Sequence, residues 1–384
     1  MAGCGSDNKT ATTSASAPPT TAAPTATTVK DAAATTAAGS ATTAAGAATT
    51  AAGAATTAEA QAPVDLNGDL VFTGFGGALG DAEKAAYFEG FKKLHPKVNI
   101  TYDEGADFAK LKAMVETGNV TWDVYTGDLF APDPSKFFEK IDCSIVPCDQ
   151  IISDTNISDY VQIYYTYSNL ITYDPSKFAN GHPTTWAEFF DTTKFPGKRA
   201  LPKTSANAMT MFTIALLADG VPKDKLFPLD YDRAIKKLNT IKKDIVFFDT
   251  NAQCPQLIRD GEATAGMCLT GRVVNAIKDG ANLKMEWNQN ISGSGAVSIV
   301  KGTKNLPTAQ AFVAYMLGAD TNALLSNYIA YGPTNKNAFG ATNPEIAPYL
   351  LSSHQDADSV SYNWPYAREN GPDMTDRFDM WLQS

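Results

Sequence analysis

The chain has 384 residues, a formal net charge of -10, five cysteines and three histidines. Because nucleic-acid binding needs basic patches, this acidic balance argues against a nucleic-acid partner. No run of about twenty apolar residues occurs, so we predict no membrane-spanning helix.

Residues 1–62 differ in composition from everything that follows. Most of them are Ala, Thr, Ser, Gly or Pro, which supply almost no large apolar side chains to offset the entropy of ordering. We therefore predict a disordered linker, followed by a folded part about two domain lengths long that begins near Val64. The opening Met1-Ala-Gly-Cys4 resembles the end of a bacterial lipoprotein signal, so Cys4 is predicted to carry a lipid anchor.

Alternating strands and helices are predicted at the start of the folded part. We expect strands over 69–73, 97–102 and 123–126, with helices from about Asp81 and over 106–117 between them. This order is typical of a parallel, doubly wound sheet. The first strand ends in Phe75-Gly76-Gly77, and free amides at this strand-to-helix turn are expected to contact an anionic or polar edge of a ligand.

The same strand-to-helix arrangement is predicted twice more. One strand is followed by Lys203-Thr204-Ser205 and an apolar helix, and a strand over 263–269 leads into Thr270-Gly271-Arg272 and another helix. Ligands of open α/β sheets lie where strands run into helices. We therefore expect Arg272, with its five fixed donors, to clamp the ligand with help from Thr204 and Ser205.

The remaining elements follow from hydrophobic periodicity. Helices are expected over 208–218, 230–243, 251–260 and 306–317, and strands over 245–248, 281–287 and 296–300. The segment 288–295 between the last two of these strands is polar and glycine-rich, and no strand is predicted over it. In the aromatic-rich stretch 160–173, alternation places Tyr165 and Tyr167 on one face of an extended segment. Together with Trp287, these two rings are expected to cover the apolar part of a ligand.

The cysteines other than Cys4 form two local pairs along the sequence. Pairing of Cys143 with Cys148 and of Cys254 with Cys268 is expected in an oxidising compartment, and the alternative is four buried free thiols. The histidines are scattered and no Cys-x-x-Cys is present, so no metal site is predicted. Neither a Gly-x-Ser-x-Gly motif nor another catalytic pattern occurs, so we expect no enzyme and no cofactor.

Four groups of motifs carry a resemblance to a known family. They are Phe75-Gly-Gly77 before a helix; Thr185-Trp-Ala-Glu-Phe-Phe190 with Phe195-Pro-Gly-Lys198; Asp260-Gly-Glu262 with Gly266-Met267 and Gly271; and Tyr331-Gly-Pro-Thr-Asn335. From about Leu70 to Asn337 the chain resembles bacterial solute-binding proteins of ABC importers, in the group of spermidine/putrescine-binding proteins. The resemblance implies an α/β fold with two lobes, each a mostly parallel sheet flanked by helices, and a ligand cleft between them.

The resemblance also implies a division of the chain and a set of partners. Lobe 1 would comprise residues 63–166 plus 294–329, and lobe 2 residues 167–293 plus 330–384, with closure by a hinge motion. The implied partners are a small-molecule ligand and the permease subunits of an ABC importer. We expect a monomer outside the cytoplasmic membrane, at the periplasmic or extracellular face, attached to the envelope only through the lipid on Cys4.

The sequence departs from the polyamine binders at positions expected to contact the ligand. Leu269-Thr270 stands where they usually show Trp-Asn, and Gly293-Ser-Gly295 stands where an acid is expected. We therefore predict a small organic ligand with an anionic or strongly hydrogen-bonding group, held by Arg272.

Three alternatives remain open at this point. A polyamine ligand would need acids, for which the candidates are Asp103, Glu104 and Asp128, the last of which we keep as a predicted ligand contact. A ferric-iron site would be built from Tyr164, Tyr165 and Tyr167. A non-transport adhesion domain at the cell surface, carried on the Ala/Thr-rich linker, would need no cleft at all.

Overall fold

The computed structural model describes residues 65–127, 133–354 and 358–384. Cys4, Asp128 and the predicted linker therefore lie outside the described residues. Gln61–Ser384 forms one compact unit, which is the part of the chain considered below. Within the described residues, no helix is both long and apolar enough to cross a membrane.

The strands agree closely with the sequence prediction except in one region. They are β1 (Gly68–Gly74), β2 (Val98–Glu104), β3 (Val124–Tyr125), β4 (Phe138–Glu139), β5 (Gln162–Tyr173), β6 (Arg199–Pro202), β7 (Ile245–Phe248), β8 (Ala265–Leu269), β9 (Lys284–Val300) and β10 (Val360–Ser361). The strand predicted over 245–248 is confirmed without change, and the first three differ from prediction by one or two residues at their ends.

Two of the helices begin and end at the residues predicted from the sequence. The helices are α1 (Gly77–Glu83), α2 (Glu89–Leu94), α3 (Phe108–Thr117), α4 (Trp186–Phe190), α5 (Ala208–Ala218), α6 (Tyr231–Asn239), α7 (Gln253–Arg259), α8 (Thr270–Lys278), α9 (Leu306–Leu317) and α10 (Trp364–Gln383). Both α5 and α9 have the predicted bounds. The segment Lys84–Phe88 forms a π-helical turn between α1 and α2.

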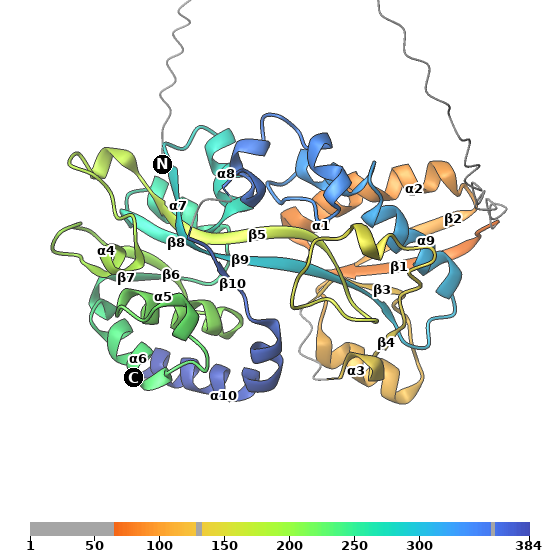
Figure 1. Cartoon of the computed structure of the whole chain (residues 1–384), viewed down its shortest axis with the longest axis horizontal. Coiled ribbons are helices and arrows are strands. Elements are labelled where there is room, and N and C mark those ends of the chain that lie inside the picture. Colours follow the sequence, from red (N-terminus) through yellow and green to blue (C-terminus); the bar gives the residue numbers. More distant parts are fainter. Residues whose placement is uncertain (1–64, 128–132, 355–357) are drawn as a thin grey trace, which may run out of the picture. The chain divides into compact units, whose positions relative to one another are not determined.

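The strands form two groups, one in each lobe, on either side of the long paired strands β5 and β9. Figure 1 shows β5 and β9 running side by side. In one, β2, β1 and β3 are parallel and β3 pairs with β9 antiparallel. In the other, β7, β6 and β8 are parallel and β8 pairs with β5 antiparallel. The predicted parallel β-α-β-α-β start is thus confirmed, and each lobe has a parallel sheet closed by antiparallel long strands.

The two strands predicted over 281–287 and 296–300 form one continuous strand, because the segment 288–295 between them is the middle of β9. Tyr165 pairs with Gly295, and Tyr167 with Gly293, across the antiparallel ladder. A Cβ atom on Gly293 would lie 2.6 Å from the Tyr167 ring, and one on Gly295 would lie 2.2 Å from the Tyr165 ring. The glycines therefore provide room for two tyrosine rings above a strand, and their presence does not mark a turn.

Two separate apolar cores lie on the two sheets. The first-lobe core includes the buried residues Leu70, Phe72, Phe91, Val297 and Phe312. The second-lobe core includes Trp186, Leu201, Phe212, Met267 and Phe378, the last of which belongs to α10. Every residue of α5 is buried, which explains why this helix lacks a polar face. The two-lobed α/β fold predicted from the resemblance is confirmed.

Both predicted cysteine pairs lie at bonding distance. The Sγ atoms of Cys143 and Cys148 are 2.12 Å apart, and those of Cys254 and Cys268 are 1.94 Å apart. The second pair joins α7 to β8 inside an apolar cluster, so it fixes the strand that leads to Arg272. Whether the thiols are oxidised in the cell remains a prediction.

Candidate functional site

A cavity of about 670 Å³ lies where the carboxyl ends of several strands meet. It is bordered by the turn between β1 and α1, the middle of β5 and β9, the segments that follow β6 and β7, and the first turns of α8 and α10. These elements belong to both sheets. The cavity therefore occupies the position where open α/β sheets bind ligands.

Most of the residues predicted as ligand contacts border this cavity. They are Phe75, Gly76, Gly77, Tyr165, Tyr167, Thr204 and Arg272. They come from four places in the chain: the turn after β1, the strand β5, the segment after β6 and the first turn of α8. Asp128 lies outside the described residues, so its predicted contact stays a prediction.

Two predicted contacts are placed elsewhere. Trp287 does not border the cavity, and its ring stacks on His354 with centroids 3.9 Å apart. Ser205 begins a short 3-10 turn, and its neighbours Thr204 and Asn207 border the cavity instead. Lys203, which precedes this turn, forms an ion pair with Asp249 at 3.2 Å, so its charge already has a partner.

Three tyrosines form an aromatic wall on the cavity. The rings of Tyr165 and Tyr331 are stacked, with centroids 4.7 Å apart and planes 14° apart, and Tyr167 lies 6.1 Å from each. Burial raises the pKa of Tyr331 to about 12, and the nearby positive charge of Arg272 opposes that rise. The phenol is therefore neutral at ordinary pH, and the wall can cover methylene groups or contact a cation.

Arg272 lies in the first turn of α8, next to this wall. The preceding residue, Gly271, allows the Tyr331 ring to lie close to the backbone of α8, because a Cβ atom at position 271 would be 2.8 Å from that ring. The Nε atom of Arg272 is buried, and no acceptor for it exists among the described residues. No carboxylate of the described residues forms an ion pair with this guanidinium either.

Arg199 shows what a buried structural guanidinium looks like in this chain. Arg199 is fully buried and donates from Nε to the Phe189 carbonyl at 2.7 Å. Its Nη1 and Nη2 atoms donate to the carbonyls of Gly197 and Phe195 at 2.8 and 2.5 Å. Because each nitrogen of Arg199 has an acceptor within the chain, the unpaired Nε of Arg272 indicates a group that serves a ligand.

Three more buried polar atoms on the cavity have no partner among the described residues. They are Asn156 Nδ2, Ser294 Oγ and Trp364 Nε1. With Arg272 Nε, they make up four of the eight such atoms in the described part of the chain. Three of the four can only donate. The residues that border the cavity therefore carry several unpaired donors, which suit an acceptor-rich group such as a carboxylate.

Two carboxylates also border the cavity, and both are exposed to solvent. They are Glu104, at the end of β2, and Asp249, after β7. Glu104 Oε1 accepts from the Gly77 amide at 3.0 Å, and the Gly76 amide donates to the Tyr102 hydroxyl at 3.0 Å. The amides predicted to be free for a ligand thus have partners within the chain, and Glu104 takes the place expected for an anion.

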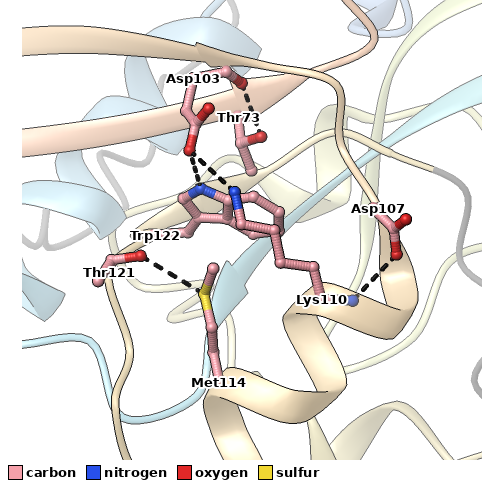
Figure 2. A network of polar contacts seen from close by, with 7 residues as sticks. All are labelled: Thr73, Asp103, Asp107, Lys110, Met114, Thr121 and Trp122. Carbon is pink, nitrogen blue, oxygen red and sulfur yellow. Dashed lines mark hydrogen bonds and ion pairs between the residues drawn. The ribbon is translucent and has the colours of Figure 1, made fainter.

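Asp103, another acid considered for a polyamine ligand, is used inside the first lobe. Figure 2 shows its carboxylate in contact with both the Trp122 indole and the Lys110 ammonium. Trp122 Nε1 donates to Asp103 Oδ2 at 2.5 Å, and Lys110 Nζ lies 4.4 Å from the Trp122 ring centroid. Because side chains alternate along β2, Asp103 and Glu104 face opposite sides of the sheet. Asp103 does not border the cavity.

A buried carboxyl group lies behind the cavity in the first lobe. Glu83 is fully buried and accepts hydrogen bonds from the hydroxyls of Tyr102, at 3.0 Å, and of Tyr164. Burial raises the pKa of Glu83 to about 7 in spite of these bonds. Tyr102 in turn accepts from the Gly76 amide, so Glu83 supports the turn that borders the cavity.

The ferric-iron alternative required three tyrosines at one point. Tyr164 is completely buried, does not border the cavity, and donates its hydroxyl to Glu83, whereas Tyr165 and Tyr167 border the cavity. The three hydroxyls therefore do not share one open site. In the part of the chain that the structure describes, no group of three or more His, Cys, Asp or Glu residues is placed to hold a metal ion.

Sequence reasoning missed several residues on the cavity. The main ones are Asn156, Asn207, Asp249, Ser294, Tyr331 and Trp364, whereas Glu104 was considered only as an acid for a polyamine. A signal existed for Tyr331, which opens the Tyr-Gly-Pro-Thr-Asn motif, and for Asp249, which follows a predicted strand. Asn156 lies in an irregular segment between β4 and β5, where no helix or strand periodicity predicts which way a side chain points.

The known proteins to which this chain is similar are solute-binding proteins. The sequence profile of the family described as "Bacterial extracellular solute-binding protein" matches residues 84–348. The gamma-aminobutyric acid-binding protein of Pseudomonas aeruginosa is 30% identical over 323 residues, which are 81% of this chain and 90% of that protein. No residue beyond 348, and so no part of α10, lies in the matched range.

Solved structures agree with the sequence relatives. The structure described as the Atu4243-GABA receptor is 36% identical with a TM-score of 0.76, covering 82% of this chain and 97% of that one. The binding protein AgtB of A. tumefaciens R10, in complex with agropinic acid, is 30% identical with a TM-score of 0.69, covering 82% and 99%. These relatives are receptors and binding proteins rather than enzymes, and none of the three is named for a polyamine. The chain belongs to the family of bacterial extracellular solute-binding proteins.

Proposed function

We propose that the protein is an extracytoplasmic receptor for a small zwitterionic solute of the GABA type, which it delivers to an ABC importer. The observation that carries this proposal is the set of buried donors on one cavity, Arg272 Nε, Asn156 Nδ2 and Trp364 Nε1, that lack acceptors among the described residues. A buried donor left unpaired costs about 1–3 kcal/mol. A carboxylate that accepts from all three would remove these costs together.

The other end of the solute is an amine in this proposal. Glu104 supplies an exposed negative charge on the same cavity, where Asp249 is already paired with Lys203, and the three tyrosines supply aromatic faces. An ammonium group is attracted both to carboxylates and to aromatic rings. Buried donors and exposed acids therefore suit opposite ends of one short molecule.

A polyamine suits this cavity less well. Spermidine and putrescine carry amines at both ends and offer no acceptor to Arg272, whose charge would repel them. The named ligands of the relatives, GABA and agropinic acid, both contain a carboxylate. We therefore rank the zwitterion above the polyamine, which remains the second candidate because Glu104 and Asp249 are acids on the cavity.

A thermal-shift screen tests the class of ligand directly. The panel holds 4-aminobutyrate, α-amino acids, monocarboxylates, phosphonates, and putrescine with spermidine, each added in excess. A ligand at a hundred to a thousand times its dissociation constant adds about 3–4 kcal/mol to the stability. We expect the largest shift with 4-aminobutyrate or a close homologue. A shift confined to polyamines would reject the proposal, and so would no shift with any solute.

The division of the chain and its attachment to the envelope are part of the same proposal. Lobe 1 comprises residues 63–166 plus 294–329 and lobe 2 residues 167–293 plus 330–384, and they close on the solute about β5 and β9. Cys4 carries the lipid that holds the receptor at the cell surface. Metabolic labelling with a fatty-acid analogue should mark the wild type and leave the Cys4→Ser variant unlabelled.

A further inference from the structure

Asn156 is a cavity residue whose amide has one end in use and one end unpaired. The residue lies in the segment between β4 and β5, and its side chain is 1% exposed. Its neighbours Ile152 and Ile157 pack against the first-lobe core. The Nδ2 atom has no acceptor among the described residues, and the residue borders the main cavity.

The other end of this amide is held by an arginine of the C-terminal helix. Arg368 Nη1 donates to Asn156 Oδ1 at 2.8 Å, and Arg368 Nη2 lies 3.5 Å from the Thr155 carbonyl oxygen. A guanidinium has donors only, so the amide must turn its oxygen toward Arg368. The NH2 group is thereby fixed on the opposite side as a donor.

Arg368 belongs to the other lobe. It lies in α10, whose residues Ala367, Met374 and Phe378 are part of the second-lobe core. Trp364, one helical turn before Arg368, borders the cavity with its own unpaired Nε1 donor. Residues four apart lie on the same face of a helix. One face of α10 therefore supplies both a cavity donor and the hydrogen bond that reaches Asn156.

We propose that Asn156 is a specificity-determining ligand contact whose donor is oriented by Arg368, and that this hydrogen bond couples ligand binding to closure of the two lobes. The inference rests on the proposed function, because it assigns the ligand's acceptor group to Asn156 Nδ2. One amide then bonds with the second lobe through its oxygen and with the solute through its nitrogen. Arg368 is a positioning residue, since it does not border the cavity.

The substitution Asn156→Asp separates the two roles of the amide. A carboxylate still accepts from Arg368, but it replaces the donor that faces the solute with a negatively charged acceptor. We expect affinity for 4-aminobutyrate to fall roughly 10- to 100-fold. Affinity for putrescine should stay the same or rise. A loss that is equal for both solutes would indicate a merely structural role for Asn156 and would overturn the assignment.

Arg368→Met removes the orienting bond without touching the solute. We expect 4-aminobutyrate to dissociate roughly 5- to 50-fold faster in stopped-flow measurements, with the association rate changed less. The matched control is Arg377→Met, which lies on the same helix and pairs with Asp373 at 3.0 Å. Arg368→Lys, which retains a charged donor, should recover part of the loss. Wild-type dissociation rates in Arg368→Met would contradict the inference.

Small-angle scattering of the solute-free proteins tests the link between lobes whatever the solute is. We expect a larger radius of gyration for Arg368→Met than for wild type and Arg377→Met. If wild type binds no carboxylate, the proposed function fails, while this comparison still decides the inter-lobe bond. If wild type binds 4-aminobutyrate but Arg368→Met changes neither the radius nor the dissociation rate, the inference fails alone.

Discussion

Replacing Arg272 with methionine should abolish tight binding without weakening the fold. Methionine keeps most of the apolar stem and removes the guanidinium. In the wild type, the Nε donor is buried without an acceptor among the described residues. An unpaired buried donor costs about 1–3 kcal/mol. The unliganded variant should therefore be as stable as the wild type or more stable, as measured by urea unfolding.

The effect on binding should have the opposite sign. Truncating one partner of a buried, hydrogen-bonded charge pair costs about 2–5 kcal/mol. This corresponds to a rise in the dissociation constant of roughly 30-fold to several thousand-fold, measured by isothermal titration calorimetry with 4-aminobutyrate. Arg259→Met is the matched control, because Arg259 is an exposed arginine paired with Asp260 at 2.9 Å.

Two results would refute this reasoning. If Arg272→Met binds 4-aminobutyrate within about twofold of wild type, Arg272 does not hold the solute. If the unliganded variant loses more than about 2 kcal/mol of stability, the guanidinium has a structural role like that of Arg199.

Three further substitutions test the supports of the site. The pKa of Glu83, raised from 4.5 to about 7, means that its stabilising contribution is complete below pH 4.5 and is lost as pH rises through 7. Wild type should thus lose on the order of 2–3 kcal/mol more than Glu83→Gln between pH 5 and pH 8 in urea unfolding, and equal pH dependence would contradict this. Joint replacement of Cys254 and Cys268 by alanine opens a loop with a sequence separation of 14 and should cost about 3 kcal/mol of stability. Alkylation of these four thiols in urea without a reductant would show that the pairs are reduced. Glu104→Gln keeps an acceptor for the Gly77 amide and removes an exposed charge, so affinity for 4-aminobutyrate should fall about two- to fivefold while that for butyrate is unchanged. An equal loss for both solutes would remove Glu104 from the amine end.

Sequence reasoning predicted the elements of the fold well because its signals are local. The apolar helix α5 and the strand β7 are each specified by their own residues, and the bounds agree. The failure at β9 has a physical cause in the partner strand. Gly293 and Gly295 disfavour a strand in isolation, so two shorter strands were predicted, but the Tyr167 and Tyr165 rings on β5 require these glycines.

The site was predictable where a strand runs into a helix and where alternation along β5 gives Tyr165 and Tyr167 a common face. Arg272 and Thr204 follow strands directly, and the topology of parallel sheets brings such positions together. Asn156 and Trp364 follow no such rule, because their places depend on how an irregular segment and the C-terminal helix pack. Trp287 was predicted to be a contact from its residue type, and its ring stacks on His354 instead.

The central claim is that one solute carries both a carboxylate for Arg272 and an amine for the acids on the cavity. Calorimetric titration of the wild type with 4-aminobutyrate, butyrate and putrescine tests it most directly, since the last two each lack one group. We predict that 4-aminobutyrate binds at least about tenfold more tightly than either butyrate or putrescine. Putrescine binding as tightly as 4-aminobutyrate, or more tightly, would contradict the account.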